Sequence, residues 1–164
     1  MKGAVTVTGS VEVAREWGRV LGVMEKSCQS YIIIRPEFIE VPGDVKSRCV
    51  QSADALELIK GALVWAHDEP VLVAASDLKD PSAPLAEYLD FVRAGFDAVV
   101  PMFDDETPQP FFAIYTPACL SALNTLVLSG QHSVSPLLEA VNTRFVEAAE
   151  VAKFGEPKMI LARD

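Results

Sequence analysis

The sequence is poor in cysteine and has no cluster of basic residues. Its three cysteines, Cys28, Cys49 and Cys119, are an odd count with no CxxC pair. This pattern excludes a zinc ribbon and a disulfide framework, and it is typical of reduced thiols. The formal net charge is -9, and no run of Lys or Arg offsets it. We therefore expect no nucleic-acid partner, because a polyanion would be repelled by such a surface.

Long hydrophobic runs are also missing. No apolar stretch approaches the ~20 residues that a membrane-spanning helix needs. The opening residues, MKGAVTVTGS, contain no extended apolar segment of the kind found in signal peptides. The sequence therefore predicts a cytoplasmic protein without a membrane anchor.

The chain is rich instead in short apolar segments that alternate with helical patterns. At 164 residues and 50% hydrophobic content, it is long enough for one domain, which we expect to span residues 1–164. The β-type runs lie at residues 4–8, 31–34, 71–75, 97–102 and 111–115, and weaker ones at 145–148 and 158–162. Alternation of this kind predicts an α/β fold with about five to seven strands: three α/β/α layers, Rossmann-like, around a mostly parallel sheet.

Helix boundaries are marked by polar residues followed by proline and by terminal glycines. The predicted helix starts are Ser52, Asp80-Pro81, Thr116-Pro117 and Ser135-Pro136, and the predicted stops are Gly95 and Gly130. Residues 35–48 contain Pro36, Pro42 and Gly43 and are expected to be irregular.

Ligands of open α/β sheets bind beyond the carboxyl ends of the strands. Asp77 follows the most apolar run, VLVAA, where its carboxylate could bind Mg²⁺ or cap a turn, and both interpretations stay open. Gly9-Ser10 follows the first strand and could offer amides to an anion, although a tight turn is favoured because no GxGxxG or GxxxxGK[ST] is present. His67 and His132 are isolated in the sequence.

Three segments in register resemble the MobA-like nucleotidyltransferases, the family of molybdenum cofactor guanylyltransferases. They are PVLVAASDL, FVRAGFDAVVP and QPFFAIYTPACLSALNTLVLSGQHSVSPLLEAV, within residues 69–141. The resemblance implies a nucleotide-diphospho-sugar transferase-like fold and Mg²⁺-dependent transfer of a nucleotidyl group to molybdopterin. It gives Asp77 the place of the metal-binding, catalytic aspartate and Gln109-Pro110 the place of the pair before the aromatic strand. Asp164 is a loose match to a closing aspartate.

The family's Gly-rich signature, Leu-Ala-Gly-Gly-x-Ser-x-Arg-Met-Gly-x-x-Lys, has no counterpart after AVTVTGS. Because nucleotidyl transfer depends on neutralising phosphate charge, this loss predicts weakened or lost catalysis. Three hypotheses follow. The first is a binder of nucleotide (GTP or CTP) or pterin. The second is an active Mg²⁺-dependent guanylyl or cytidylyl transferase using Asp77, and the third is a structural partner in a hetero-oligomer.

Overall fold

A seven-stranded sheet forms the centre of the molecule, in the order β3-β2-β1-β4-β6-β5-β7. The computed structural model describes residues 1–7, 17–37, 39, 41 and 46–163. The strands are β1 (Lys2–Thr6), β2 (Tyr31–Pro36), β3 (Ser47–Val50), β4 (Val71–Ala75), β5 (Ala98–Pro101), β6 (Phe112–Tyr115) and β7 (Thr143–Val146). Every neighbouring pair is parallel except the two that β6 makes, with β4 and with β5.

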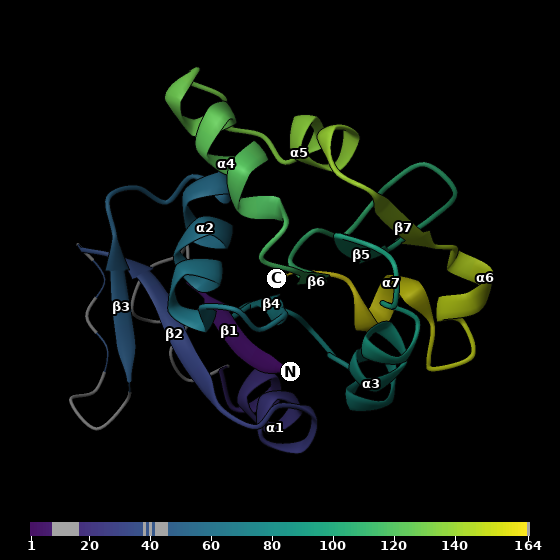
Figure 1. Cartoon of the computed structure of the whole chain (residues 1–164). Helices are drawn as coiled ribbons and strands as arrows, with labels where there is room; N and C mark the ends of the chain where they lie inside the picture. The colour runs from purple at the N-terminus through teal and green to yellow at the C-terminus, as the bar shows by residue number, and fades with distance from the viewer. Residues whose placement is uncertain (8–16, 38, 40, 42–45, 164) are drawn as a thin grey trace.

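Helices cover both faces of this sheet (Figure 1). On one face α2 (Ala55–Ala66) packs against α4 (Cys119–Leu128), and α5 (Ser135–Ala140) follows α4. On the other face α1 (Trp17–Ser27) packs against α3 (Ala83–Phe91). Two short helices, α6 (Ala148–Val151) and α7 (Pro157–Ile160), come after β7. The predicted three-layer α/β/α fold with a mostly parallel sheet is therefore confirmed.

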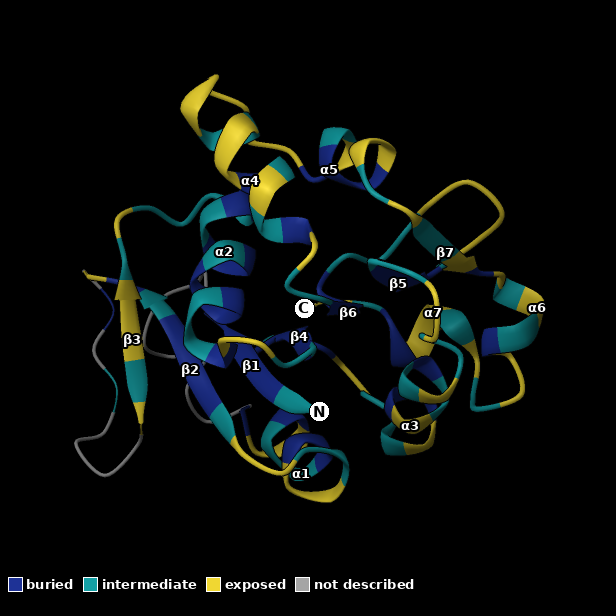
Figure 2. Cartoon of the chain, viewed as in Figure 1, coloured by how far each residue is buried: buried dark blue, intermediate teal, exposed yellow. Residues whose placement is uncertain are grey.

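The central strands are buried on both sides, as Figure 2 shows. All five residues of β4 are buried, as are all four of β5 and of β6. Parallel strands covered by helices on both faces read as continuous apolar runs, so VLVAA was the most easily recognised strand in the sequence. Phe112 and Tyr115 have no exposed surface and Phe111 is 8% exposed, which confirms that these aromatics belong to the core.

Several predicted boundaries differ from the structure. The segment expected to be irregular, residues 35–48, holds the end of β2 and the start of β3, an edge strand whose middle residues, Arg48 and Cys49, are exposed. Asp54, rather than Ser52, is the N-cap of α2, and the Ser52 hydroxyl instead accepts a hydrogen bond from the Asp54 amide at 3.0 Å.

Two further helices also begin later than predicted. The N-cap of α3 is Ser82, whose hydroxyl accepts a hydrogen bond from the Leu85 amide at 3.3 Å, rather than Asp80. The N-cap of α4 is Ala118, because Thr116 and Pro117 form a preceding turn in which the Cys119 amide donates to the Thr116 carbonyl. The start of α5 at Ser135 was predicted correctly.

The end of the chain also differs from its prediction. Residues 158–162 were expected to be strand-like, but they contain most of α7 and then a short extended piece in which Arg163 forms an isolated antiparallel bridge with Leu78. Figure 1 places this end of the chain beside β4 and β6. None of the described helices is long and apolar enough to cross a membrane.

Candidate functional site at the carboxyl end of β4

The sheet topology brings together two segments that are more than thirty residues apart in the sequence. Because β4 and β6 are antiparallel, the carboxyl end of β4 lies beside the amino end of β6, with Ala74 opposite Phe112. The Ala75 amide donates to the Phe111 carbonyl at 2.8 Å. The loop that carries Asp77 and the loop that carries Gln109 and Pro110 therefore meet at one edge of the sheet.

The main chain fixes Asp77 firmly at this edge. The preceding residue, Ser76, is buried, and its amide donates to the carbonyl of Thr6 on β1 at 3.0 Å. The Asp77 side chain is 19% exposed. Position and partial exposure are those expected of a carboxylate at a ligand-binding edge.

The Asp77 carboxylate is held by an arginine from the end of the chain. Arg163 Nε donates to Asp77 Oδ1 at 2.7 Å, and the Arg163 side chain is 33% exposed. The guanidinium of Arg163 also lies 5.6 Å from the centroid of the Phe111 ring, within cation–π range. Neither open interpretation of Asp77, a metal ligand or a turn cap, included this ion pair, which joins residues 86 positions apart.

The Gln109 side chain links the loop before β6 to the end of the chain. Its Nε2 donates to the Leu161 carbonyl at 2.7 Å, and its Oε1 accepts from the Phe111 amide at 3.2 Å. The Pro110 carbonyl accepts a hydrogen bond from the Tyr115 hydroxyl at 2.9 Å. Both residues precede β6, and contact with a ligand stays a prediction for each.

The remaining sequence candidates lie elsewhere. Gly9, Ser10, Arg15 and Asp164 are outside the described residues, so the predicted anion cradle has no structural description. Lys79 lies two residues after Asp77, and its main-chain carbonyl accepts a hydrogen bond from the Arg19 guanidinium of α1. The guanidinium of Arg19, a residue that no sequence pattern indicated, therefore also lies beside the loop after β4.

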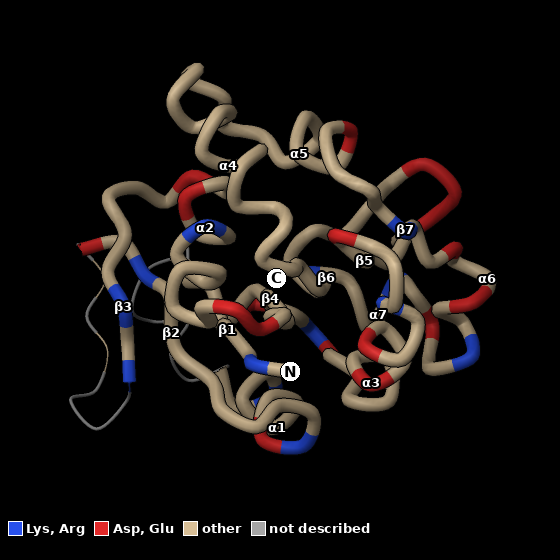
Figure 3. Tube along the Cα trace, in the orientation of Figure 1, with Lys and Arg blue, Asp and Glu red and all other residues tan. Residues whose placement is uncertain are grey.

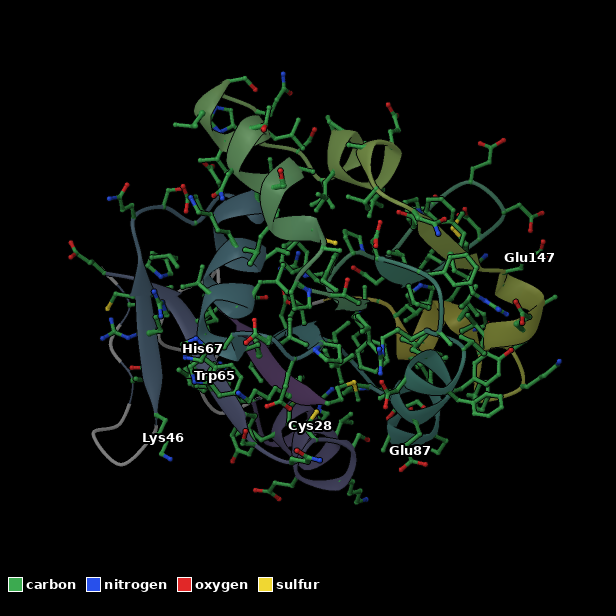
Figure 4. The ribbon with its side chains drawn as sticks, viewed as in Figure 1. Cys28, Lys46, Trp65, His67, Glu87 and Glu147 are labelled. Carbon is green, nitrogen blue, oxygen red and sulfur yellow. The ribbon has the colours of Figure 1, made fainter. Side chains whose placement is uncertain are left out.

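The other titratable candidates have ordinary structural partners. His132 lies 2.9 Å from the Asp54 carboxylate, an exposed contact that sequence spacing did not indicate, and hydrogen bonds from Ser52 and His132 lower the pKa of Asp54. Asp104 closes a turn in the acidic loop that follows β5, which Figure 3 shows in red beside β7. Hydrogen bonds from Thr107 and Glu106 lower the pKa of the Asp104 carboxyl. Figure 4 shows His67 beside Trp65 at the end of α2.

The described residues do not fit a divalent metal. No group of three or more His, Cys, Asp or Glu side chains among them could hold an ion. Mg²⁺ requires near-octahedral oxygen ligands, and Asp77 supplies one carboxylate that is already bonded to a cation. A cavity of about 590 Å³ opens nearby between α1, the start of α3 and α7, but Asp77, Gln109 and Pro110 do not line it.

Two of the known proteins similar to this chain are named as a guanylyltransferase and a cytidylyltransferase. No protein-family model matches the chain. The chain is 26% identical over 106 residues to the "Probable molybdenum cofactor guanylyltransferase" of Methanosarcina mazei, a match that covers 64% of this chain and 47% of that protein. The MobA-like resemblance is thereby confirmed. The chain spans about half the length of that curated relative.

Solved structures agree with the fold of this chain. The molybdopterin-guanine dinucleotide biosynthesis protein A of Archaeoglobus fulgidus superposes with a TM-score of 0.73 at 21% identity, over 100% of this chain and 92% of that one. The 2-C-methyl-D-erythritol 4-phosphate cytidylyltransferase of Thermus thermophilus gives 0.64 at 15% identity, over 90% and 89%. A Mycobacterium tuberculosis protein solved in complex with manganese gives 0.60 at 12%, over 89% and 86%.

Proposed function

We propose that this MobA-like chain binds a nucleotide or a molybdopterin-type pterin at the edge formed by the loops after β4 and before β6, with nucleotidyl transfer lost or weakened. The observation that carries the proposal is the meeting of Asp77, Gln109-Pro110 and Phe111 at that edge. A carboxylate, a partly exposed guanidinium and an aromatic ring are groups that recognise a ring system with polar edges.

Weak catalysis follows from the electrostatics of phosphate transfer. Such a reaction needs several fixed donors and cations around the transferring phosphate, because the protein contributes little covalent chemistry. The Gly-rich signature with its Arg and Lys is absent from the sequence. The acidic candidate at the site, Asp77, is bonded to Arg163, and among the described residues it belongs to no group of three or more His, Cys, Asp or Glu side chains that could hold a metal ion.

The relatives supply the ligand classes to test. A guanylyltransferase and a cytidylyltransferase are both similar to this chain, which makes GTP, CTP and the pterin acceptor the first ligands. Magnesium enters by resemblance alone. A site for a protein partner is the competing proposal, and the strongly exposed Leu128 and Phe91 are the apolar side chains that favour it.

Thermal unfolding with each ligand, with and without Mg²⁺, tests the proposal. A ligand at a hundred times its Kd adds about 2.7 kcal/mol of stability. We expect stabilisation by at least one of the three ligands, reduced by Asp77→Asn and unchanged by Asp90→Asn. Asp90 forms an ion pair with Arg93 on α3 and is a matched control for charge removal. Stabilisation by none of them at millimolar concentration contradicts ligand binding, and Asp77-dependent GTP turnover at ordinary enzymatic rates contradicts weakened catalysis.

A further inference from the structure

We propose that Arg163 is a built-in cation that takes the place of a divalent metal at Asp77. Asp77 then accepts either the guanidinium or a metal ion, but not both. The inference goes beyond the proposed function, because it concerns the metal dependence of the site whichever ligand binds there. It makes Arg163 the residue that determines whether a metal can enter.

The ion pair is short and partly shielded from water. The separation of 2.7 Å between Arg163 Nε and Asp77 Oδ1 is that of a charge-assisted hydrogen bond. The two side chains are 33% and 19% exposed, so solvent screens their attraction less than it screens a fully exposed pair. A metal ion that approaches this carboxylate must therefore replace a hydrogen-bonded cation and not merely water.

The main chain places Arg163 opposite Asp77 independently of that bond. Residue 163 forms an antiparallel bridge with Leu78, and the Lys79 amide donates to the Ala162 carbonyl at 3.0 Å. Just before them, Leu161 is fully buried and its carbonyl accepts from the Gln109 side chain. A backbone bridge together with a side-chain bond to the neighbouring Leu161 carbonyl differs from a chance contact between two long surface side chains.

The Phe111 ring fixes the far side of the guanidinium. Its centroid lies 5.6 Å from Arg163 Cζ, and the Phe111 main chain accepts a hydrogen bond from the Ala75 amide and donates one to the Gln109 side chain. The ring covers one face of the cation and limits its hydration. The same ring is part of the site proposed for the ligand, so Arg163 contacts two residues of that site, Asp77 and Phe111.

The charge balance explains why the two cations exclude each other. Two positive charges within a few ångströms of one carboxylate repel each other, and the described residues offer no group of acidic or histidine ligands that would offset this repulsion. Replacing the guanidinium by an uncharged side chain leaves the Asp77 charge without its partner. The lone carboxylate then becomes a better metal ligand.

Direct titration with Mn²⁺ alone, followed by the electron paramagnetic resonance signal of the free ion, tests this proposal. We expect Arg163→Gln to bind Mn²⁺ at least about tenfold more tightly than the unaltered chain. The double variant Arg163→Gln, Asp77→Asn should lose the gain, whereas Arg163→Lys should stay near the unaltered affinity because it keeps the charge. Arg93→Gln is the matched control, since the Arg93–Asp90 pair is 2.9 Å long with 32% and 35% exposed side chains.

Circular dichroism establishes that each variant is folded before titration. If the glutamine variant does not fold, Arg163→Met repeats the test with an uncharged stem. The proposal is overturned if the unaltered chain binds Mn²⁺ as tightly as the uncharged variants, or if their gain survives Asp77→Asn. Because no nucleotide or pterin is present, the outcome is independent of whether the proposed function is right.

Discussion

Tyr115→Phe tests whether the loop before β6 is held by one buried hydrogen bond. The Tyr115 side chain is fully buried, and its hydroxyl donates to the Pro110 carbonyl at 2.9 Å. Burial raises the pKa of this phenol well above its usual value, so the hydroxyl stays protonated and remains a donor at any working pH. Phenylalanine keeps the ring and its packing, and removes only the donor.

The expected cost of Tyr115→Phe combines the lost hydrogen bond with the carbonyl that it leaves unpaired. Together these amount to about 1–2 kcal/mol in the free energy of unfolding. For a chain of this length that loss lowers Tm by roughly 3–6 °C. Urea denaturation measures it directly, and the m-value should not change because the surface exposed on unfolding is the same.

Tyr31→Phe is the matched control. The Tyr31 hydroxyl contacts the Glu25 carboxylate at 3.5 Å in an exposed position, so its removal should change stability by less than about 0.5 kcal/mol. Equal effects of the two substitutions would refute the reasoning, as would a Tyr115→Phe variant as stable as the unaltered chain. A loss of ligand stabilisation in Tyr115→Phe at unchanged fold would also connect the bond to the site.

Two helical glycines and two thiols give further tests. Gly61→Ala on α2 places a methyl group 2.6 Å from Val50 Cγ1 on β3 and should lower the free energy of unfolding by about 1–2 kcal/mol. Gly22→Ala on α1 meets no described atom within 4 Å and should raise it by roughly 0.5–1 kcal/mol. Urea denaturation measures both changes. Cys49 is exposed and should react readily with a thiol reagent at pH 8. Cys119 should react far more slowly in the folded chain, because burial raises the pKa of its thiol to about 11; equal rates would contradict the packing of α4.

The sequence predicts the central strands well, because burial on both faces of the sheet requires apolar residues there. VLVAA became β4 residue for residue, because a central strand covered on both faces tolerates no polar side chain. The segment SRCV gave no such signal. It becomes β3 only by pairing with β2, where Ile33 lies opposite Ser47, and an edge strand needs neither alternation nor a buried face.

Helix starts were predicted less well, because several residues near each start can cap it. Asp80-Pro81 and Ser82 both fit the pattern of a polar residue before the first turn, and the structure uses Ser82, whose hydroxyl reaches the Leu85 amide. The segment at residues 158–162 has strand-like composition, yet Pro157 begins a helical turn there. Local propensity alone does not choose between these outcomes.

The site shows most clearly what sequence spacing omits. Asp77 and Gln109 were recognised as candidates, but their meeting depends on the antiparallel direction of β6, which no periodicity reveals. After Gly9-Ser10 the sequence holds no Lys or Arg until Arg15. The structure instead brings Arg163 to Asp77 and Arg19 to the carbonyl of Lys79.

The local charge of the site is therefore set by tertiary contacts, and the formal net charge of -9 does not describe it. An arginine held by a backbone bridge lies beside Asp77 without any supply of metal, whereas a bound ion depends on its supply. In a chain without the phosphate-binding signature, the Arg163–Asp77 pair is useful only if a neutralised carboxylate stabilises the fold or strengthens ligand binding. Thermal unfolding of Arg163→Lys and Arg163→Gln with each ligand tests whether the pair serves ligand binding. If the ligand stabilises only the lysine variant, then ligand binding requires the positive charge at this edge of the sheet.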